Sequence, residues 1–369
     1  MSEGSRPRVL HLVPALFGAG GVIGGGERYV FELARHMAAV TPTTLLSFGG
    51  ADEIRREGPL TIRVLGEPWL VRRQRSNPFS PRILSSVREC DVVHCHQQHI
   101  LVSSFAAAVA RATGRRVVCT DLGGGGWDVS AYVNTDRWYH AHLHLSEYSR
   151  RIAGHERSPR ASVIYGGVDA ARFCPGPHDG AGRNALFVGR ILPHKGLDDF
   201  VDALGVERPG VIVGPAPDAA YLALLRERAR GRPVEFRHGC SDDDLVTSYR
   251  QAACVVLPSV YRDRDGRHTE VPELLGQTLL EAMACGRPAI CTAVASLPEI
   301  VEHGVTGLVV PPNDPVALGA ALRWIAAHPE EARRMGEAGR RRVLERFTWD
   351  AVVRRCLDRY ASGAGRLAA

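Results

Sequence analysis

Short apolar runs alternate with segments of helical period along most of the chain. The run Arg8–Pro14 predicts a strand, and Glu27–Ala39, with its apolar residues on one face, predicts a helix. Strands that alternate with helices indicate a parallel sheet covered on both faces. In the first half we expect a helix at Ile100–Ala112 and strands at Thr43–Phe48, Thr61–Leu65, Asp91–Cys95, Arg116–Thr120, His142–Ser146 and Ala161–Tyr165.

The same alternation starts again after Cys174–Arg183, a stretch rich in proline and glycine. Such a composition is typical of a linker. We therefore expect two doubly wound α/β domains, 1–175 and 176–369, with a ligand in the cleft between them, beyond the carboxyl ends of the strands. The last helix, Trp349–Ala361, is expected to pack back toward the N-terminal domain. Expected strands of the second series are Ala185–Val188, Gly210–Val213, Val234–Arg237, Cys254–Leu257, Ala289–Thr292 and Gly307–Val310, and expected helices are Leu197–Leu204, Asp218–Arg230, Asp242–Gln251, Thr278–Cys285 and Pro315–His328.

Bulk composition narrows the class of protein. The length of 369 residues suits two domains, and 45% hydrophobic with 23% charged residues is typical of a globular chain. The net charge of +6 fits an anionic small molecule or a membrane surface, but no dense basic stripe indicates nucleic acid. No apolar run reaches the length of about 18 residues that a transmembrane helix needs. Nine scattered cysteines without a CxxC pattern favour reduced thiols in a cytoplasm.

A single lysine stands among 46 lysine and arginine residues. This residue, Lys195, lies in FVGRILPHKG together with Gly189 and Arg190. The ammonium group of lysine is a compact charge with three donors, and arginine does not replace it one to one. Two cations beside a glycine turn that follows an apolar strand are what a bound diphosphate requires, although a surface lysine left by chance would give the same pattern.

Two carboxylates, Glu273 and Glu281, flank a loop at Gly276 and the start of a helix. Glu281 could accept the hydroxyls of a ribose and Glu273 those of a sugar, although an ordinary amphipathic helix with two surface glutamates has the same spacing. The first amides of such a helix bind phosphate when they are unpaired. The amides concerned are those of Thr278, Leu279 and Leu280.

The segment Glu273-x7-Glu281 followed by AMACGRP, with VGRILPHKG upstream, resembles the retaining family 4 glycosyltransferases of the GT-B fold. Four other segments are similar to that family, and the order of the motifs is more specific than any one of them. These segments are GGGERYVFELARHM, VIYGGVDAARF, SLPEIVEHGVTGLVVPPND and FTWDAVVRRCLDRY.

The resemblance implies a nucleoside diphosphate sugar held mainly by the C-terminal domain, with uridine favoured by family frequency. Arg190 and Lys195 would neutralise the diphosphate, Glu281 would bind the ribose and Glu273 the sugar. Gly25 and Gly26 would approach the donor phosphates from the other domain. The resemblance also implies that no metal ion or other cofactor is needed, because two cations and helix amides stabilise the leaving group.

The N-terminal half departs from the family at Asp121, which stands where many members carry a histidine. An aspartate accepts hydrogen bonds but does not donate one at pH 7, so its catalytic role is open. The glycine run that includes Gly124 either approaches a substrate closely or forms a mobile loop. Acceptor contacts are predicted for His96, His99, Gly124 and Trp127.

His94, His96 and His99 could suggest a metal site, but no carboxylate or cysteine pair nearby completes one. We therefore favour packing or cleft-lining histidines and expect no metal. Two charged loops stay open. Tyr261–Glu270 is either a solvated loop or a segment that acts as a lid or acceptor contact. Trp69–Arg75 fits an exposed basic loop better than a membrane contact.

The sequence thus predicts a bacterial, cytoplasmic, retaining hexosyl- or N-acetylhexosaminyltransferase, with weak association with the membrane surface left open. Alternatives with the same fold are a nucleotide-sugar epimerase or hydrolase and a non-catalytic nucleotide-sugar sensor. A nicotinamide-dependent oxidoreductase is disfavoured, because Thr43–Phe48 lacks the acidic residue expected there. The acceptor could be a small molecule, a lipid-linked intermediate or a polysaccharide precursor. The sequence specifies neither it, nor the donor sugar, nor the oligomeric state.

Overall fold

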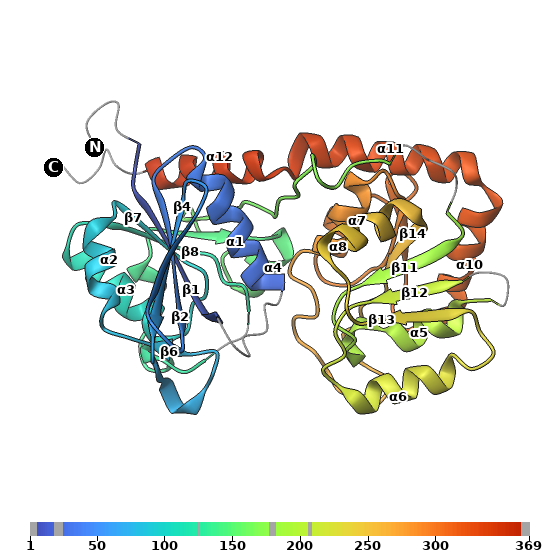
Figure 1. Ribbon diagram of the computed structural model, residues 1–369, viewed down its shortest axis with the longest axis horizontal. Coiled ribbons are helices and arrows are strands. Elements are labelled where there is room, and N and C mark those ends of the chain that lie inside the picture. The colour runs from blue at the N-terminus through green and yellow to red at the C-terminus, as the bar shows by residue number, and fades with distance from the viewer. Residues whose placement is uncertain (1–5, 18–24, 124–125, 177–181, 206–208, 363–369) are drawn as a thin grey trace. The chain divides into compact units, whose positions relative to one another are not determined.

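The computed structural model describes residues 6–17, 25–123, 126–176, 182–205 and 209–362. The chain divides into two compact units (Figure 1). The first consists of Met1–Gly167 with Trp349–Ala369, and the second of Val168–Thr348. Each unit is a sheet with helices on both of its faces.

The first unit contains an eight-stranded sheet in the order β10-β9-β8-β7-β1-β2-β4-β3. All neighbours in this sheet pair in parallel except β3 and β4, which are antiparallel. The expectation of parallel strands alone is therefore wrong at this edge. The strands are β1 Val9–Phe17, β2 Thr43–Gly49, β3 Glu53–Glu57, β4 Leu60–Gly66, β7 Val92–Cys95, β8 Arg116–Cys119, β9 Ala141–His144 and β10 Ala161–Val163.

Helices of the first unit cover a core that includes Leu10, Val93 and Ala107. The C-terminal helix α12 packs against α1, where the ring of Trp349 lies 5.4 Å from Tyr29 and 5.9 Å from His36, measured between centroids. The helices are α1 Gly25–Ala38, α2 Ile83–Glu89, α3 Leu101–Ala112, α4 Glu147–Ile152 and α12 Trp349–Ala361, and a small hairpin pairs β5 Trp69–Leu70 with β6 Pro78–Phe79.

The second unit contains six parallel strands in the order β13-β12-β11-β14-β15-β16. The strand order reverses between β11 and β14, which makes this point the switch point where doubly wound sheets bind ligands. The strands are β11 Asn184–Val188, β12 Gly210–Val213, β13 Val234–Arg237, β14 Ala252–Leu257, β15 Ala289–Thr292 and β16 Gly307–Val310. The helices are α5 Leu197–Ala203, α6 Ala219–Arg228, α7 Asp242–Gln251, α8 Gln277–Ala284, α9 Leu297–Ile300, α10 Pro315–Ala327 and α11 Pro329–Arg346.

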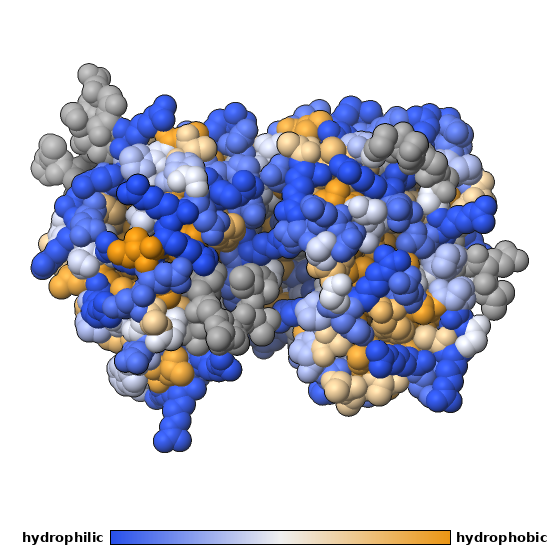
Figure 2. Space-filling model, in the orientation of Figure 1, coloured by the Kyte–Doolittle hydropathy of each residue, from blue (hydrophilic) through white to orange (hydrophobic). Residues whose placement is uncertain are grey.

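The surface is mostly hydrophilic on the face shown in Figure 2. Trp69 and Tyr132 are among the large apolar side chains that are exposed. None of the nine cysteines forms a disulfide, and most are buried. Within the described ranges, no helix is both long and apolar enough to cross a bilayer.

Candidate active site

The switch point of the second unit is built from two close backbone turns. After β11, the chain turns through Gly189 (φ 152°) and the short helix η4, Pro193–Lys195, to Gly196 (φ 64°). A Cβ at Gly196 would lie 2.0 Å from the carbonyl oxygen of Pro258, so only glycine fits there. The Val260 amide after β14 donates to the His194 carbonyl at 2.9 Å. These contacts fix the segment that carries Lys195.

Lys195 and Glu273 form an ion pair at this point. The Lys195 Nζ atom donates to Glu273 Oε1 at 2.5 Å, and the Ser259 hydroxyl donates to the same oxygen at 2.6 Å. The two charged side chains are only 13% and 10% exposed. In the part of the chain that the structure describes, no residue donates to the other carboxylate oxygen, Glu273 Oε2. The pair therefore retains one free carboxylate oxygen and two further donors on the ammonium group.

Of the two other basic side chains at the carboxyl end of β11, Arg190 and His194, only Arg190 adds positive charge to that of Lys195. Arg190 is exposed and forms no ion pair with the residues described. Burial and, second, the neighbouring Lys195 lower the pKa of His194 to about 4, so this imidazole is neutral at pH 7. The cationic groups available to an anion at this turn are therefore Arg190 and Lys195.

Glu281 lies within α8 and is 6% exposed. The hydroxyl of Tyr249 donates to Glu281 Oε2 at 2.7 Å, which fixes the position of the carboxylate. Helix α8 begins after Gly276, whose φ of 85° is in the left-handed region. The prediction of unpaired amides is wrong at Leu279, because this amide donates to the Gly276 carbonyl at 3.0 Å. The first turn tightens to an i→i+3 bond, which uses that donor, and phosphate binding by Thr278 and Leu280 stays a prediction.

Sequence reasoning missed Ser259 and Tyr249. Ser259 lies two residues after the end of the β14 strand, and the rule that ligands bind beyond strand ends at a switch point could have identified it. Tyr249 is on α7, and nothing in its sequence surroundings indicates that its hydroxyl reaches α8.

The loop Tyr261–Glu270 is anchored to the second unit. Arg264 forms ion pairs with Asp198 at 2.6 Å, Asp199 at 2.9 Å and Asp202 at 2.7 Å, on α5. The Tyr261 hydroxyl accepts from the Ala295 amide at 2.8 Å. A role as a lid stays a prediction, but these contacts hold the loop more firmly than a purely solvated turn.

In the first unit, the predicted glycines lie at the start of α1. A Cβ on Gly25 would meet nothing within 4 Å, and one on Gly26 would meet Leu122 at 3.7 Å. Asp121 Oδ1 accepts from the Gly123 amide at 3.2 Å, which stabilises the turn after β8. Gly124 is outside the described residues.

Trp127 and His99 are held by their neighbours. The Trp127 carbonyl accepts from Asn77 Nδ2 at 2.7 Å, and the Arg72 guanidinium lies 4.2 Å from the centre of its indole ring. The exposed His99 has its Nδ1 atom 2.9 Å from the Ser130 hydroxyl. Contact of either residue with an acceptor stays a prediction.

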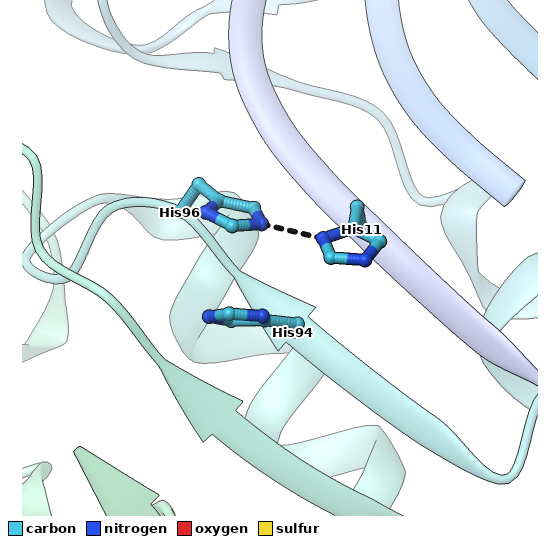
Figure 3. A group of neighbouring side chains, drawn as sticks. All are labelled: His11, His94 and His96. Carbon is cyan, nitrogen blue, oxygen red and sulfur yellow. Dashed lines mark hydrogen bonds between the residues drawn. The ribbon is translucent and has the colours of Figure 1, made fainter. Parts of the chain in front are cut away.

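His11, His94 and His96 form a buried cluster between β1 and β7 (Figure 3). His11 Nδ1 and His96 Nε2 are 2.8 Å apart, and the rings of His94 and His96 lie 4.1 Å apart. Both His94 nitrogens have partners: Nδ1 is 2.7 Å from the Tyr360 hydroxyl and Nε2 is 2.8 Å from that of Thr120. Burial lowers the pKa of His11 to about 3. The geometry is that of neutral packing histidines, and with His96 1% exposed, its contact with an acceptor stays a prediction.

Two family models match the chain. The one described as "Glycosyl transferases group 1" matches residues 176–342, and the one described as "Glycosyltransferase Family 4" matches residues 23–172. The Family 4 match ends at residue 172 and the group 1 match begins at residue 176, so the boundary between the two matches lies around Cys174.

Curated relatives are bacterial glycosyltransferases. D-rhamnosyltransferase WbpZ of Pseudomonas aeruginosa is 36% identical over 165 residues, which cover 44% of this chain and 41% of that protein. A D-inositol 3-phosphate glycosyltransferase of Streptomyces bingchenggensis is 31% identical over 54% of this chain and 47% of its own length. The chain thus spans about half the length of these two relatives. A GDP-mannose-dependent phosphatidylinositol monomannoside mannosyltransferase of Mycobacterium tuberculosis is 28% identical over 89% of this chain and 83% of its own length.

Solved structures share the fold. Anabaena HepE, solved in complex with UDP, superposes with a TM-score of 0.73 at 17% identity, over 95% of this chain and 98% of HepE. Sucrose-phosphate synthase of Thermosynechococcus elongatus superposes with a TM-score of 0.70 at 20% identity, over 96% of this chain and 98% of the synthase. At these identities the likeness shows the fold.

Proposed function

Because this chain belongs to the family 4 glycosyltransferases of the GT-B fold, we propose that it transfers a glycosyl group from a nucleoside diphosphate sugar to a hydroxyl group. The observation that carries this proposal is the Lys195–Glu273 pair beside Arg190 at the switch point of the second unit. At this point a cation that can bind phosphate, Lys195, is in direct contact with a carboxylate that can bind hydroxyl groups, Glu273. A sugar diphosphate offers both kinds of group.

The donor diphosphate is proposed to bind to Arg190 and Lys195. One ammonium donor of Lys195 is held by Glu273, and the other two can reach phosphate oxygens. Glu273 Oε2 accepts a hydrogen bond from a hydroxyl group of the sugar. Glu281, which is held by Tyr249, accepts hydrogen bonds from the ribose hydroxyls. This arrangement brings the two cations to the diphosphate, where negative charge develops when the leaving group departs.

The proposed reaction retains the anomeric configuration. The bond between the anomeric carbon and the diphosphate oxygen breaks as the acceptor oxygen bonds to the same face of that carbon. The acceptor's proton passes to the departing diphosphate oxygen, so no protein base is needed. Arg190 and Lys195 supply the charge that a metal ion would supply elsewhere, and we propose that transfer needs none.

The names of the relatives point to two different donor bases. HepE has been solved with UDP and with UDP-glucose, whereas the mycobacterial relative is named for GDP-mannose. We favour a UDP-sugar and place acceptor recognition in the first unit. Nine thiols without a disulfide fit a reducing cytoplasm, which is the compartment we propose.

A panel of UDP-, GDP-, ADP- and dTDP-sugars, screened by thermal shift, tests the proposal. A bound donor raises the melting temperature by mass action. The best donor is then incubated with candidate acceptors, and NMR of the product gives the anomeric configuration. Transfer with retention is expected. Release or isomerisation of the sugar without an acceptor would favour the hydrolase or epimerase instead, and an inverted product would exclude the mechanism.

A further inference from the structure

A second group of polar side chains lies in the first unit, on elements that the proposed transfer reaction does not use. Asp136 begins the short helix η3, Asp136–Trp138, His142 lies in β9, and His155 follows α4. Each of these side chains has one oxygen or nitrogen atom that could bind a metal ion, and these three atoms all lie within 4.8 Å of one another.

The distance between the Asp136 and His155 side chains suits a shared ion better than a direct hydrogen bond. His155 Nε2 and Asp136 Oδ2 are 3.6 Å apart, which is too long for a hydrogen bond. Two ligands of one tetrahedral zinc ion, with bonds of about 2.0–2.1 Å, are separated by about 3.4 Å. His142 Nε2 lies 3.2 Å from the Asp136 carbonyl oxygen, and its ring centre lies 4.3 Å from that of His155.

The residues around the cluster orient it. Gln98 Nε2 donates to Asp136 Oδ1 at 2.6 Å, which leaves Oδ2 on the side of His155. His144 Nε2 lies 3.1 Å from His155 Nδ1. His155 Nδ1 can donate a hydrogen bond to this nitrogen. His155 then directs an unprotonated Nε2 toward Asp136, which is the arrangement of metal-binding histidines.

This cluster differs from the histidine cluster in Figure 3 in its charge and in its access to solvent. Asp136 supplies a carboxylate, and its side chain is 38% exposed, while that of His155 is 11% exposed. An ion can therefore reach the site from solvent. His11, His94 and His96 are at most 1% exposed, and the group they form includes no carboxylate.

We propose that Asp136, His142 and His155 bind a divalent transition-metal ion of the zinc class. Imidazole nitrogens with one carboxylate suit Zn²⁺ or Co²⁺, whereas Mg²⁺ prefers oxygen ligands. His144 and Gln98 hold two of the ligands, and water occupies the fourth position. His142 binds through Nε2, which requires the hydrogen bond from Nε2 to the Asp136 carbonyl oxygen to break and the proton to move to Nδ1. The ion stabilises the segment between η3 and α4, and this role is independent of glycosyl transfer.

Metal binding is measured on the full-length protein, free of any histidine tag and stripped with chelator. Equilibrium dialysis against micromolar Zn²⁺ should give one bound ion per chain, and Co²⁺ should give the visible absorption of tetrahedral coordination. Asp136→Asn and His155→Gln should each weaken binding at least tenfold. Gln98→Ala should weaken it about tenfold, as for other residues that support a ligand.

His96→Gln is the matched control, because it removes a histidine of the other cluster. It should bind Zn²⁺ like the unaltered protein, and loss of binding in this variant would overturn the proposal. A wild-type protein that binds no ion, or an Asp136→Asn protein that binds normally, would overturn it as well. Wild-type binding is also read from a Zn²⁺-dependent rise in melting temperature, which needs no variant. No sugar nucleotide is present, so failure here leaves the proposed transfer reaction untested and intact.

Discussion

Lys195 donates to Glu273 Oε1 at 2.5 Å, although the two residues belong to segments that follow different strands, β11 and β14. The pair is nearly buried, so its attraction is screened little by salt. A compact ammonium can serve Glu273 and a phosphate at once, whereas a planar guanidinium directs its donors in one fork. This geometry gives a physical reason for a single lysine at this position.

Replacement of Lys195 by alanine should lower kcat/KM by at least 10²–10³, the cost of removing one donor at a developing charge. The variant should also lose about 3 kcal/mol of stability, because the nearly buried Glu273 carboxyl group loses its partner. Steady-state kinetics and urea unfolding of the same preparation measure both effects.

Two further variants distinguish a loss of catalytic activity from a loss of stability. Lys195→Arg keeps the charge and should recover stability better than activity. Glu273→Gln keeps the Ser259 contact and removes the charge, and it should stay folded while activity falls. Activity within threefold of the unaltered enzyme in Lys195→Arg would contradict the need for an ammonium group.

Tyr249→Phe removes the hydroxyl that donates to Glu281 Oε2 at 2.7 Å. Glu281 then loses its orientation, and KM for the donor should rise about three- to tenfold while kcat changes little. The loss of one hydrogen bond should cost about 1 kcal/mol of stability. Donor titrations and denaturant unfolding measure these changes.

Tyr221→Phe is the matched control for Tyr249→Phe. The Tyr221 hydroxyl donates to Asp198 at 2.9 Å between α6 and α5. This variant should lose similar stability without any rise in KM. Equal KM values for the two variants would show that the Tyr249 contact only stabilises the fold.

The sequence predicted the doubly wound class because strand and helix periods alternate clearly, and α7 and α12 match their predicted bounds at both ends. It missed β3, because Glu-Ile-Arg-Arg-Glu has one apolar residue and lies exposed at an edge. The positions of Lys195 and Glu273 beyond strand ends were readable from local pattern. Their direct pairing and the Tyr249 contact could not be predicted from the sequence, because these contacts join segments that are distant in the sequence and meet only in the folded chain. The Asp136 cluster was missed for the same reason, because Asp136, His142 and His155 are spread over 20 residues, whereas His94, His96 and His99 stand close together in the sequence.

Acid should destabilise the first unit more than the second. Burial lowers the pKa of His11 to about 3, of His142 to about 4 and of His144 to about 3. Below pH 6.5 the unfolded chain binds these protons and the folded chain does not, so stability falls as pH falls from 6.5 toward 4. Each such histidine contributes a slope of up to about 1.4 kcal/mol per pH unit.

Hydrogen exchange by mass spectrometry at pH 7, 6 and 5, corrected for the intrinsic rate, reports the opening of each unit separately. Among the described residues of the second unit, His194 is the one histidine with a clearly lowered pKa, so this unit should show the smaller slope. Equal slopes in the two units would contradict the assignment of neutral buried histidines to the first.

Gly25→Ala tests whether the start of α1 approaches the donor. An added Cβ would meet nothing within 4 Å, and alanine favours a helix, so stability should be unchanged or higher by up to about 1 kcal/mol. KM for the donor should rise about tenfold if the phosphates lie against this backbone. Gly50→Ala, where an added Cβ also meets nothing within 4 Å, should leave both stability and KM unchanged. A Gly25→Ala enzyme with normal KM would remove Gly25 from the donor site.

Transfer should survive removal of divalent ions. Arg190 and Lys195 supply two positive charges at the switch point, so EDTA should change kcat/KM by less than twofold and Mg²⁺ should not raise it. The assay should be repeated in Asp136→Asn, because loss of an ion from the proposed cluster in the first unit could destabilise that unit in the unaltered protein. An EDTA effect that disappears in Asp136→Asn belongs to that cluster. An EDTA effect that Mg²⁺ reverses in both proteins means that a metal ion stabilises the leaving diphosphate, and the roles of Arg190 and Lys195 would then have to be reassigned.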